Sequence, residues 1–419
     1  MIFNNLINFI LKLLVLFLRI IIFSISRIII IKFVLFETSR VGGISRTIDD
    51  FLYHPIEKKN YVKYIFIYFR ELPISNYFFQ NLVEKEIKKI DKNTYFFDNS
   101  KFSKYLFSSF SRFPFGKESF HRPYNELKER NNLFFNYDYV KNPQLRLNSK
   151  ESTKGYKLLE ELKIKNKKKW ICIHNRDSNY LKILKNHENF KNINFAYHNY
   201  RDSDVNNLIK STKLLLEKNF TVFRMGRIQS NKMNFKQEDF IDYAFDDKKS
   251  DFNDIFLLTN CEAYLGSDAG ISDIPFISGK PRFLTNYSLT LIHLFHHGGH
   301  YLSRKNHYPF IFKHLYDEKN KTKLSLKQIL KKGLNGASRV EDFKNAGVIP
   351  IENSEDELLD LTLEMANYLD TKNFNTKDDY EIQKKFWDIY YSNTNYKRYE
   401  DIPARVCSNF LLKNSYILE

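Results

Sequence analysis

Apolar runs rich in β-branched residues alternate with amphipathic runs along this chain, and the alternation constrains the fold more than any other feature. In the N-terminal part, predicted strands at 27–36 and 61–70 flank a short helix at 44–53, and a helix at 75–90 follows, capped by Ser75. Strand–helix–strand–helix at this spacing favours parallel pairing, because a crossover helix carries the chain back to the starting edge of the sheet. We therefore predict a Rossmann-like sheet in this part.

The second half repeats the pattern. Predicted helices cover 149–164, 202–219, 250–260 and 354–370, and predicted strands cover 169–176, 220–227 and the apolar runs on both sides of the loop at 266–271. Asp202 or Ser203 is the expected cap of the helix at 202–219. The predicted fold class is α/β, with two Rossmann-like domains facing a cleft and an N-terminal amphipathic or membrane helix.

Composition narrows the class of protein. The chain has 419 residues and a net charge of +17, spread along its length rather than gathered in one patch. It has no zinc-finger or RRM signature, so nucleic acid is not an expected partner. The three cysteines, Cys172, Cys261 and Cys407, form no CxxC pair, which argues against a disulfide framework and favours a reducing cytoplasm.

The N-terminal segment 2–23 is almost entirely apolar. On a helix, one narrow polar stripe would be formed by Asn5, Asn8, Lys12, Arg19 and Ser26. This pattern favours a helix lying on an anionic membrane surface, with Lys12 and Arg19 reaching lipid phosphates. A transmembrane anchor is the second alternative and a helix buried against the domain is the third.

Basic residues follow two predicted strands of the second half. Arg176 ends the first strand, and Arg224 and Arg227 come at the end of the next. The loop after the third strand is rich in small and polar residues: Gly266, Ser267, Asp268 and Gly270. Because parallel strands end at one edge of a sheet, we expect these groups to converge on a diphosphate, with the glycines letting the main chain approach it.

Two other motifs have ordinary explanations. The segment RDSD at 201–204 resembles the Asp-x-Asp metal motif of sugar transferases, but it opens a predicted helix, where Asp and Ser are common caps. The histidine-rich segment at 293–300 is dense enough for zinc, but no nearby carboxylate or cysteine completes a site. We therefore predict no metal site.

In the first half, the glycine-rich segment SRVGGISRTIDD joins the first strand to the next helix. Gly42 and Gly43 are expected in a tight turn, beside Arg40, and this loop is the predicted acceptor loop. Asp49 and Asp50 are the nearest carboxylates, and one of them is the candidate general base for an incoming hydroxyl. An acidic pair on a short helix is otherwise usually exposed to solvent.

Several blocks, in order, resemble a family of bacterial glycosyltransferases associated with surface polysaccharide synthesis, and more distantly the heptosyltransferases. The blocks are KWICIHNRDSNYL, YRDSDVNNL, FTVFRMGR, DIFLLTNCEAYLGSDAGISDIPFISGKPRFLTN and GVIPIENSEDELLDLTLEMANYL, within residues 145–370, and TSRVGGISRTIDDFL near the N-terminus. The resemblance implies the GT-B arrangement, two Rossmann-like domains around a nucleotide-sugar cleft.

The resemblance also marks individual residues. The matching positions for donor binding are His174, Arg176, Asp177, Arg224, Gly226, Gly266, Gly270 and Asn286. Two positions depart from the family pattern: Ala269 stands where a serine hydroxyl is usual, and Gly43 stands where a histidine is usual. The second departure leaves Asp49 as the matching acidic position.

The expected domains are a membrane-associated helix at 1–26, an acceptor domain at 27–148, a nucleotide-sugar domain at 149–350, and helices at 351–419 that pack back across the domains. The expected function is transfer of a sugar from a nucleotide-diphosphate donor to a lipid-linked or polysaccharide acceptor, at the cytoplasmic face of the inner membrane. The expected enzyme needs no metal or other cofactor.

Two alternatives stay open at this point. The same fold could transfer polyol phosphate or another activated group. The chain could instead be a non-catalytic, membrane-bound module that binds an anionic polymer or RNA, and such binding would weaken steeply with salt. The donor sugar, its nucleotide, the acceptor and the stereochemical course are not specified by the sequence.

Overall fold

The computed structural model describes residues 2–25, 28–52, 63–98, 143–164, 169–288, 308–374, 377–395 and 404–419. The chain divides into two compact units, Met1–Arg130 and Asn131–Glu419, and each is described by itself. The boundary at Arg130, the histidine-rich segment 293–300 and most of the stretch 99–148 lie outside the described residues.

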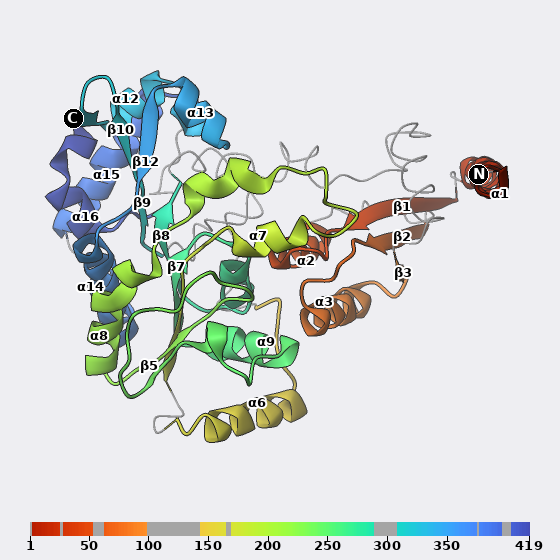
Figure 1. Ribbon diagram of the computed structural model, residues 1–419, viewed down its shortest axis with the longest axis horizontal. Coiled ribbons are helices and arrows are strands. Elements are labelled where there is room, and N and C mark those ends of the chain that lie inside the picture. Colours follow the sequence, from red (N-terminus) through yellow and green to blue (C-terminus); the bar gives the residue numbers. More distant parts are fainter. Residues whose placement is uncertain are drawn as a thin grey trace. The chain divides into compact units, whose positions relative to one another are not determined.

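The first unit contains a three-stranded parallel sheet in the order β1-β2-β3 (Figure 1). Its elements are α1 (Ile2–Ile25), β1 (Ile29–Phe36), α2 (Val41–Leu52), β2 (Lys63–Arg70), α3 (Tyr77–Ile90) and β3 (Thr94–Asp98). The predicted strand–helix alternation is confirmed, and β3 is a strand that the sequence pattern did not reveal. The cap of α3 is Asn76 and not Ser75, whose hydroxyl donates instead to the carbonyl oxygen of Thr38 at 2.9 Å.

One face of this sheet receives the N-terminal helix. Val15 and Ile22 of α1 form a buried cluster with Phe33 of β1 and Phe69 of β2. The two phenylalanine rings are stacked with centroids 6.1 Å apart. No helix among the described residues is long and apolar enough to cross a membrane.

The second unit is built on a six-stranded parallel sheet in the order β6-β5-β4-β7-β8-β9. The strands are β4 (Trp170–His174), β5 (Thr221–Arg224), β6 (Phe240–Ile241), β7 (Ala263–Ser267), β8 (Arg282–Tyr287) and β9 (Phe310–Phe312). Counted along this sheet's own strands, the order is 3-2-1-4-5-6, the order of dinucleotide-binding Rossmann folds. The direction of winding reverses between β4 and β7, and we call this place the switch point.

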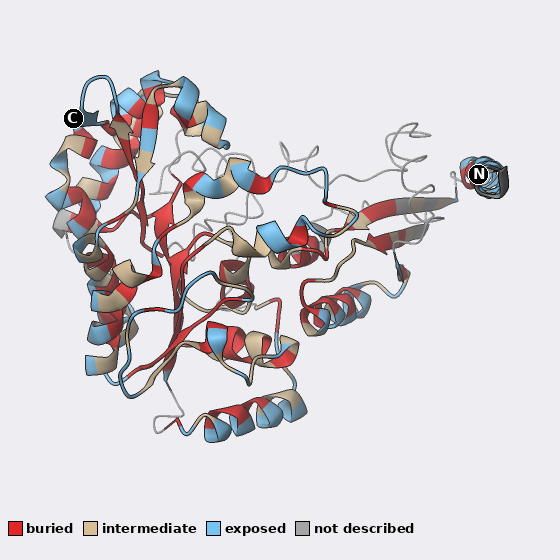
Figure 2. Cartoon of the chain, in the orientation of Figure 1, coloured by how far each residue is buried: buried red, intermediate tan, exposed pale blue. Residues whose placement is uncertain are grey.

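Helices and short 3-10 turns surround this sheet (Figure 1). They are α6 (Ser149–Glu161), α7 (Asn179–Leu184), η1 (Phe195–Arg201), η2 (Val205–Leu208), α8 (Ile209–Glu217), η3 (Tyr243–Phe245), α9 (Asp251–Asn260), η4 (Gly270–Ser272) and α10 (Asp273–Ile277). Every residue of β4, β5, β7 and β8 is buried, as expected of parallel strands covered on both faces (Figure 2). The predicted helix at 202–219 begins later than expected, because Asp204 caps η2, which leads into α8.

The last part of the chain adds a small antiparallel sheet and more helices. These elements are β10 (His314–Asp317), β11 (Thr322–Lys323), α12 (Leu326–Lys331), η6 (Leu334–Gly336), α13 (Val340–Asn345), β12 (Val348–Ile351), α14 (Glu355–Thr371), α15 (Lys377–Ser392), α16 (Ser408–Lys413) and η7 (Ser415–Leu418). All of them belong to the second unit. Thr362 of α14 donates to Ser211 of α8 at 2.8 Å, which ties α14 to the sheet's covering layer.

The C-terminal segment also completes the edge of the large sheet. Val406 forms a parallel bridge with Phe310 of β9, through backbone hydrogen bonds of 3.0 and 2.9 Å on the two sides. The fold is therefore α/β with parallel sheets in both units, as predicted. The cleft between the two domains stays a prediction, and so does the packing of the helices at 351–419 across both domains. The structure defines each unit by itself.

Candidate functional site

The switch point is the place where a sheet of this topology binds ligands, because the loops after β4 and β7 lead away in opposite directions and leave a crevice. His174 of β4 pairs directly with Gly266 of β7. A Cβ atom on Gly266 would lie under 3.0 Å from three backbone atoms of His174. The close approach of the two strands is thus enough to require a glycine here. The approach of a phosphate to this glycine stays a prediction.

His174 is held as a neutral ring. Its Nδ1 donates to the carbonyl oxygen of Met225 at 2.9 Å, and the side chain is buried. Burial lowers the pKa of His174 to about 4, and the nearby guanidinium of Arg224 acts in the same direction. At neutral pH this histidine therefore adds no charge to the switch point and serves to position the end of β5.

Two serines connect the loops at the switch point. The backbone N–H of Arg176 donates to Ser267 Oγ at 3.2 Å, and Ser267 Oγ lies 3.1 Å from Ser203 Oγ. The backbone N–H of Ser203 donates to the carbonyl oxygen of Arg176 at 3.0 Å, and Asn175 Nδ2 donates to the carbonyl oxygen of Ser203 at 3.0 Å. The segment 201–204 is therefore fixed across the ends of both strands.

Three cationic side chains gather on this segment, and we call Arg176, Arg201 and Lys313 the switch-point cations. Arg176 pairs with the carboxylate of Asp202, Arg201 donates to the carbonyl oxygen and the carboxylate of Asp268, and Lys313 donates to the carbonyl oxygen of Asp202. Arg176 and Lys313 are buried, and Arg201 is partly buried.

The electrostatics of the cations match this crowding. Burial and the charge of Arg201 lower the pKa of Arg176. Burial likewise lowers the pKa of Lys313. Burial raises the pKa of Asp202, against the opposing effect of Arg176.

The other two predicted arginines have different surroundings. Arg224 is 1% exposed and its guanidinium contacts Asp242, Asn175 and Gln229 at 3.0, 3.1 and 3.0 Å. Its guanidinium therefore holds the side chain of Asn175 in place and is not exposed to solvent. Arg227 is partly exposed and pairs with Asp251 at the start of α9. Arg224 ends β5, which pairs with β4, and Arg227 lies three residues beyond it. Within the described residues, neither arginine is seen to contact the loop at 266–271, so their predicted convergence with that loop on a diphosphate stays a prediction.

The remaining predicted donor residues hold loops together. Asp177 accepts from the backbone N–H groups of Asn179 and Ser230, at 3.0 and 2.7 Å, which connects the loops after β4 and β5. Gly226 lies where a Cβ atom would be 2.6 Å from the side chain of Gln229. Asp268 accepts from Arg201, as described above, and Gly270 begins η4.

Asn286, at the end of β8, has a φ of 49° and exchanges two hydrogen bonds with Asn353. The backbone N–H of each residue donates to the Oδ1 of the other, at 2.9 and 2.8 Å. Asn353 Nδ2 also donates to the carbonyl oxygen of Phe312 at 2.9 Å. The asparagine pair thus fixes the ends of β8 and β9 against the segment before α14.

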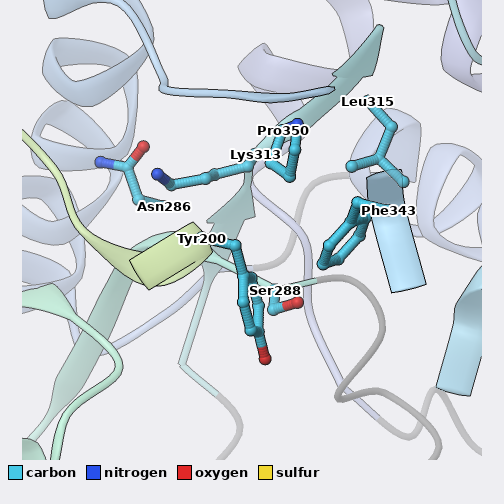
Figure 3. A pocket seen from close by; sticks show the side chains of 7 residues that line it. All are labelled: Tyr200, Asn286, Ser288, Lys313, Leu315, Phe343 and Pro350. Carbon is cyan, nitrogen blue, oxygen red and sulfur yellow. The ribbon is translucent and has the colours of Figure 1, made fainter. Parts of the chain in front are cut away.

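A pocket lies beside the switch-point cations (Figure 3). Its cavity is small, about 10 Å³, which is roughly the space that one water molecule needs, and it is lined by Tyr200, Asn286, Ser288, Lys313, Leu315, Phe343 and Pro350. Lys313 belongs both to this pocket and to the switch-point cations, and Tyr200 directly precedes Arg201. Burial raises the pKa of the Tyr200 hydroxyl, which therefore stays protonated at neutral pH.

The predicted acceptor loop of the first unit is partly corrected. Gly42 and Gly43 lie in the first turn of α2, so the predicted tight turn is wrong. A Cβ atom on Gly43 would lie under 3.0 Å from Glu37, which explains the glycine by packing. Arg40 pairs with Glu37 at 3.2 Å. The side chains of Asp49 and Asp50 lie outside the described part of the structure, although their backbone is in α2.

Sequence reasoning missed Tyr200, Arg201, Asp202, Ser203 and Lys313 as members of this site. The segment RDSD has the composition of ordinary helix caps, yet Asp204 alone caps the helix and the three residues before it contact the switch point. Lys313 directly follows β9, so its position at a strand end was the available signal. Among the described residues, no group of three His, Cys, Asp or Glu side chains is arranged to hold a metal ion.

No protein-family model matches the chain, and no curated protein matches it. Among solved structures, it is similar to a family 9 glycosyl transferase from Veillonella parvula, with 11% identity, a TM-score of 0.42, and coverage of 80% of this chain and 98% of that one. It is also similar to the ADP-heptose LPS heptosyltransferase II of E. coli, with 11% identity, a TM-score of 0.35, and coverage of 60% and 84%. A third is the iron-containing dodecameric glycosyltransferase TibC of enterotoxigenic E. coli, at 9% identity, TM-score 0.29, and coverage of 61% and 58%.

Proposed function

We propose that this chain is a glycosyltransferase that moves a sugar from a nucleotide-diphosphate donor to a hydroxyl group of an acceptor. The observation that carries the proposal is the group of switch-point cations, Arg176, Arg201 and Lys313, at the ligand-binding edge of a sheet with Rossmann strand order. Guanidinium and ammonium groups bind phosphate oxygens. Ser203 and Ser267 lie beside them, and because one of their hydroxyls donates to the other, the pair offers one further hydroxyl hydrogen.

In the proposed reaction, the bond from the anomeric carbon to the diphosphate oxygen breaks, and a bond from that carbon to the acceptor oxygen forms. Negative charge grows on the departing diphosphate, and the switch-point cations stabilise it. Because Asp202, Asp268 and a backbone carbonyl already hold these cations, little reorganisation is needed when the charge develops. Preorganised donors of this kind contribute roughly 3–4 kcal/mol each in well-studied sites.

The carboxylate of Asp202 does not saturate the guanidinium of Arg176. A guanidinium group has five N–H donors, so a contact with one carboxylate oxygen leaves others for a phosphate. In this proposal the cations supply the positive charge that a metal ion supplies in Asp-x-Asp transferases, and no other cofactor takes part. Asp202 is engaged by Arg176 and Asp204 caps η2, so both carboxylates of the RDSD segment are used by the protein itself.

The acceptor side of the proposal rests on the sequence. The resemblance of the sequence blocks favours a lipid-linked or polysaccharide acceptor in cell-surface glycan synthesis, at the cytoplasmic face of the inner membrane. Asp49 or Asp50 of α2 is the proposed general base that takes the proton of the acceptor hydroxyl.

Nucleotide binding by Arg176 and Asp202 variants tests the proposal. Calorimetric titration with UDP, GDP, ADP and CMP, and then with their sugars, should find one saturable partner. Arg176→Ala should weaken its binding at least about tenfold, because a charge-assisted hydrogen bond is lost. Asp202→Asn should leave binding intact or strengthen it, because a carboxylate that competes with phosphate for Arg176 is removed.

The pair of variants separates binding from structure. If Arg176 and Asp202 merely stabilise the fold, both substitutions should damage binding alike. Arg146→Ala, at an exposed arginine of the same unit, is the matched control and should have no effect. The proposal would be contradicted if no nucleotide bound saturably and if Arg146→Ala and Arg176→Ala weakened the binding of an anionic polymer equally.

A further inference from the structure

The N-terminal helix α1 contacts its own unit through one narrow stripe. Val15 is 3% exposed and Ile22 is 8% exposed, and both pack against Phe33 and Phe69 of the sheet. Arg19 lies on the same stripe and is 9% exposed, and burial lowers its pKa. This corrects the expectation that Arg19 reaches lipid phosphates, because its part of the polar stripe faces the protein.

The rest of the helix is an exposed apolar surface. Eleven large apolar side chains of its described part are between 38% and 62% exposed: Leu6, Ile7, Phe9, Ile10, Leu13, Leu14, Leu16, Phe17, Ile20, Ile21 and Phe23. Monomeric soluble proteins rarely expose an apolar patch of this extent, and such a patch marks an interaction surface. We call these eleven side chains the α1 surface.

The sheet extends this surface. Phe97 of β3 pairs with Phe69 of β2, so its side chain is on the sheet face that receives α1, and the two ring centroids are 6.3 Å apart. Tyr95, two residues earlier on the same face, is 49% exposed and Phe97 is 50% exposed. Exposed aromatic residues of this kind are typical of the boundary between lipid and water.

The width of the α1 surface identifies its partner. At 3.6 residues per turn, the eleven positions spread over roughly 200° of the helix circumference. A second helix, such as α1 of another copy, would cover only a narrow stripe of about two positions in seven. A bilayer surface can cover the whole arc, because a helix lying in the interface is immersed along its side.

Charge specifies the kind of bilayer. Residues 1–36 contain no Asp or Glu, whereas Lys12, Arg27 and Lys32 are basic, and the whole chain carries +17. Lys12 is exposed. Basic residues next to an interfacial helix attract anionic lipid headgroups. We propose that α1, together with Tyr95 and Phe97, docks the protein on the surface of an anionic bilayer without crossing it.

Vesicle cosedimentation of the full chain tests this proposal. Vesicles of phosphatidylcholine with roughly a quarter phosphatidylglycerol should bind the protein, and vesicles of phosphatidylcholine alone should bind it at least about tenfold more weakly. Leu13→Glu combined with Phe17→Glu should weaken binding to the anionic vesicles at least about tenfold. The matched control is Leu412→Glu, at a leucine of α16 that is 64% exposed, and it should bind like the wild type.

Each other outcome overturns the proposal. Equal binding of the double variant shows that the α1 surface is not the contact, and equal binding to neutral vesicles shows that charge plays no part. Protein that stays with the vesicles after alkaline carbonate extraction crosses the bilayer instead of lying on it. A lipid-free dimer that the double variant dissociates, with no vesicle binding, assigns the surface to a second copy. None of these readouts depends on nucleotide binding, so this proposal and the proposed function fail separately.

Discussion

Gly266 lies directly opposite His174 across the switch point, and no side chain larger than hydrogen fits between the two strands. Gly266→Ala should therefore lower the free energy of unfolding by about 2 kcal/mol or more, because backbone atoms of His174 cannot move aside as a flexible side chain can. Urea denaturation measures this. Gly336→Ala is the control, because a Cβ atom added there would meet nothing within 4 Å, and it should change stability by less than ~0.5 kcal/mol.

Two arginines near the end of β5 should differ strongly in their contribution to stability. Arg224→Met removes a fully buried guanidinium with three partners and leaves Asp242 without its cation, so a loss of about 3 kcal/mol is expected. Arg227→Met breaks a partly exposed pair with Asp251 and should cost less than about 1 kcal/mol. Chemical denaturation of both variants in one buffer makes the comparison, and equal losses would show that Arg224 has no special structural role.

The neutral, buried ring of His174 predicts an acid-sensitive fold. Its pKa falls from 6.5 in the unfolded chain to about 4 in the folded protein. Its contribution to stability is fully present above pH 6.5 and is lost progressively as the pH falls toward 4, because only the unfolded chain takes up the proton. The loss is on the order of 3 kcal/mol. Unfolding curves at several pH values should show that the free energy of unfolding depends less steeply on pH in this window for His174→Asn than for the wild type. Identical slopes for the two proteins would contradict the low pKa of His174.

A second pH effect should come from Glu357, which joins three parts of the second unit. His314 Nε2 donates to its carboxylate at 2.7 Å, Asn414 donates to it at 2.9 Å, and the hydroxyl of Tyr416 bonds the other ring nitrogen of His314. Burial acts to raise the pKa of Glu357, but these hydrogen bonds and the charge of His314 outweigh it and lower the pKa to about 2. The stabilisation is present above pH 4.5 and is lost as the pH falls through 2.

Glu357→Gln should therefore cost about 2 kcal/mol at pH 7 and progressively less below pH 4.5. Thermal unfolding monitored by circular dichroism across this range measures the difference. Glu355→Gln replaces an exposed carboxylate in the first turn of the same helix and should have an effect below ~0.5 kcal/mol at every pH. A loss in Glu357→Gln that does not depend on pH would mean that packing, and not charge, is what the carboxylate provides.

The sequence pattern predicted most strands and helices of both units because each is a local feature. The runs that became β1, β2, β4, β5 and β7 are mainly apolar, as expected of strands in parallel sheets. β8 is buried throughout although it contains Arg282, Thr285 and Asn286, and its apolar residues together with the preceding turn marked it. The edge strands β3, β6 and β9 are short or contain polar residues, so no run of sufficient length marked them. The antiparallel sheet of β10, β11 and β12 depends on pairing between distant segments, which local patterns do not reveal.

Only those parts of the candidate site that have a local signal in the sequence were predicted. Arg176 stood out because it lies at the end of an apolar run, a position visible in the sequence. Arg201 and Lys313 did not, because their roles arise from contacts with Asp268 and Asp202 that span 67 and 111 residues. Asp202 looked like a cap, but pairing with Arg176 outweighs that local preference, and Asp204 takes the capping position. Tertiary contacts thus decided which of several locally equivalent Asp and Ser residues caps the helix and which ones contact the switch point.

The bridge between Phe310 and Val406 has a consequence for biosynthesis. During translation, β9 emerges long before the segment that pairs with its outer side, so the backbone groups of Phe310 lack these partners until residue 407 has left the ribosome. An uncovered strand edge can pair with another nascent chain. The second unit is therefore expected to mature late and in one final step, and premature termination before residue 406 should yield aggregating rather than merely shortened protein.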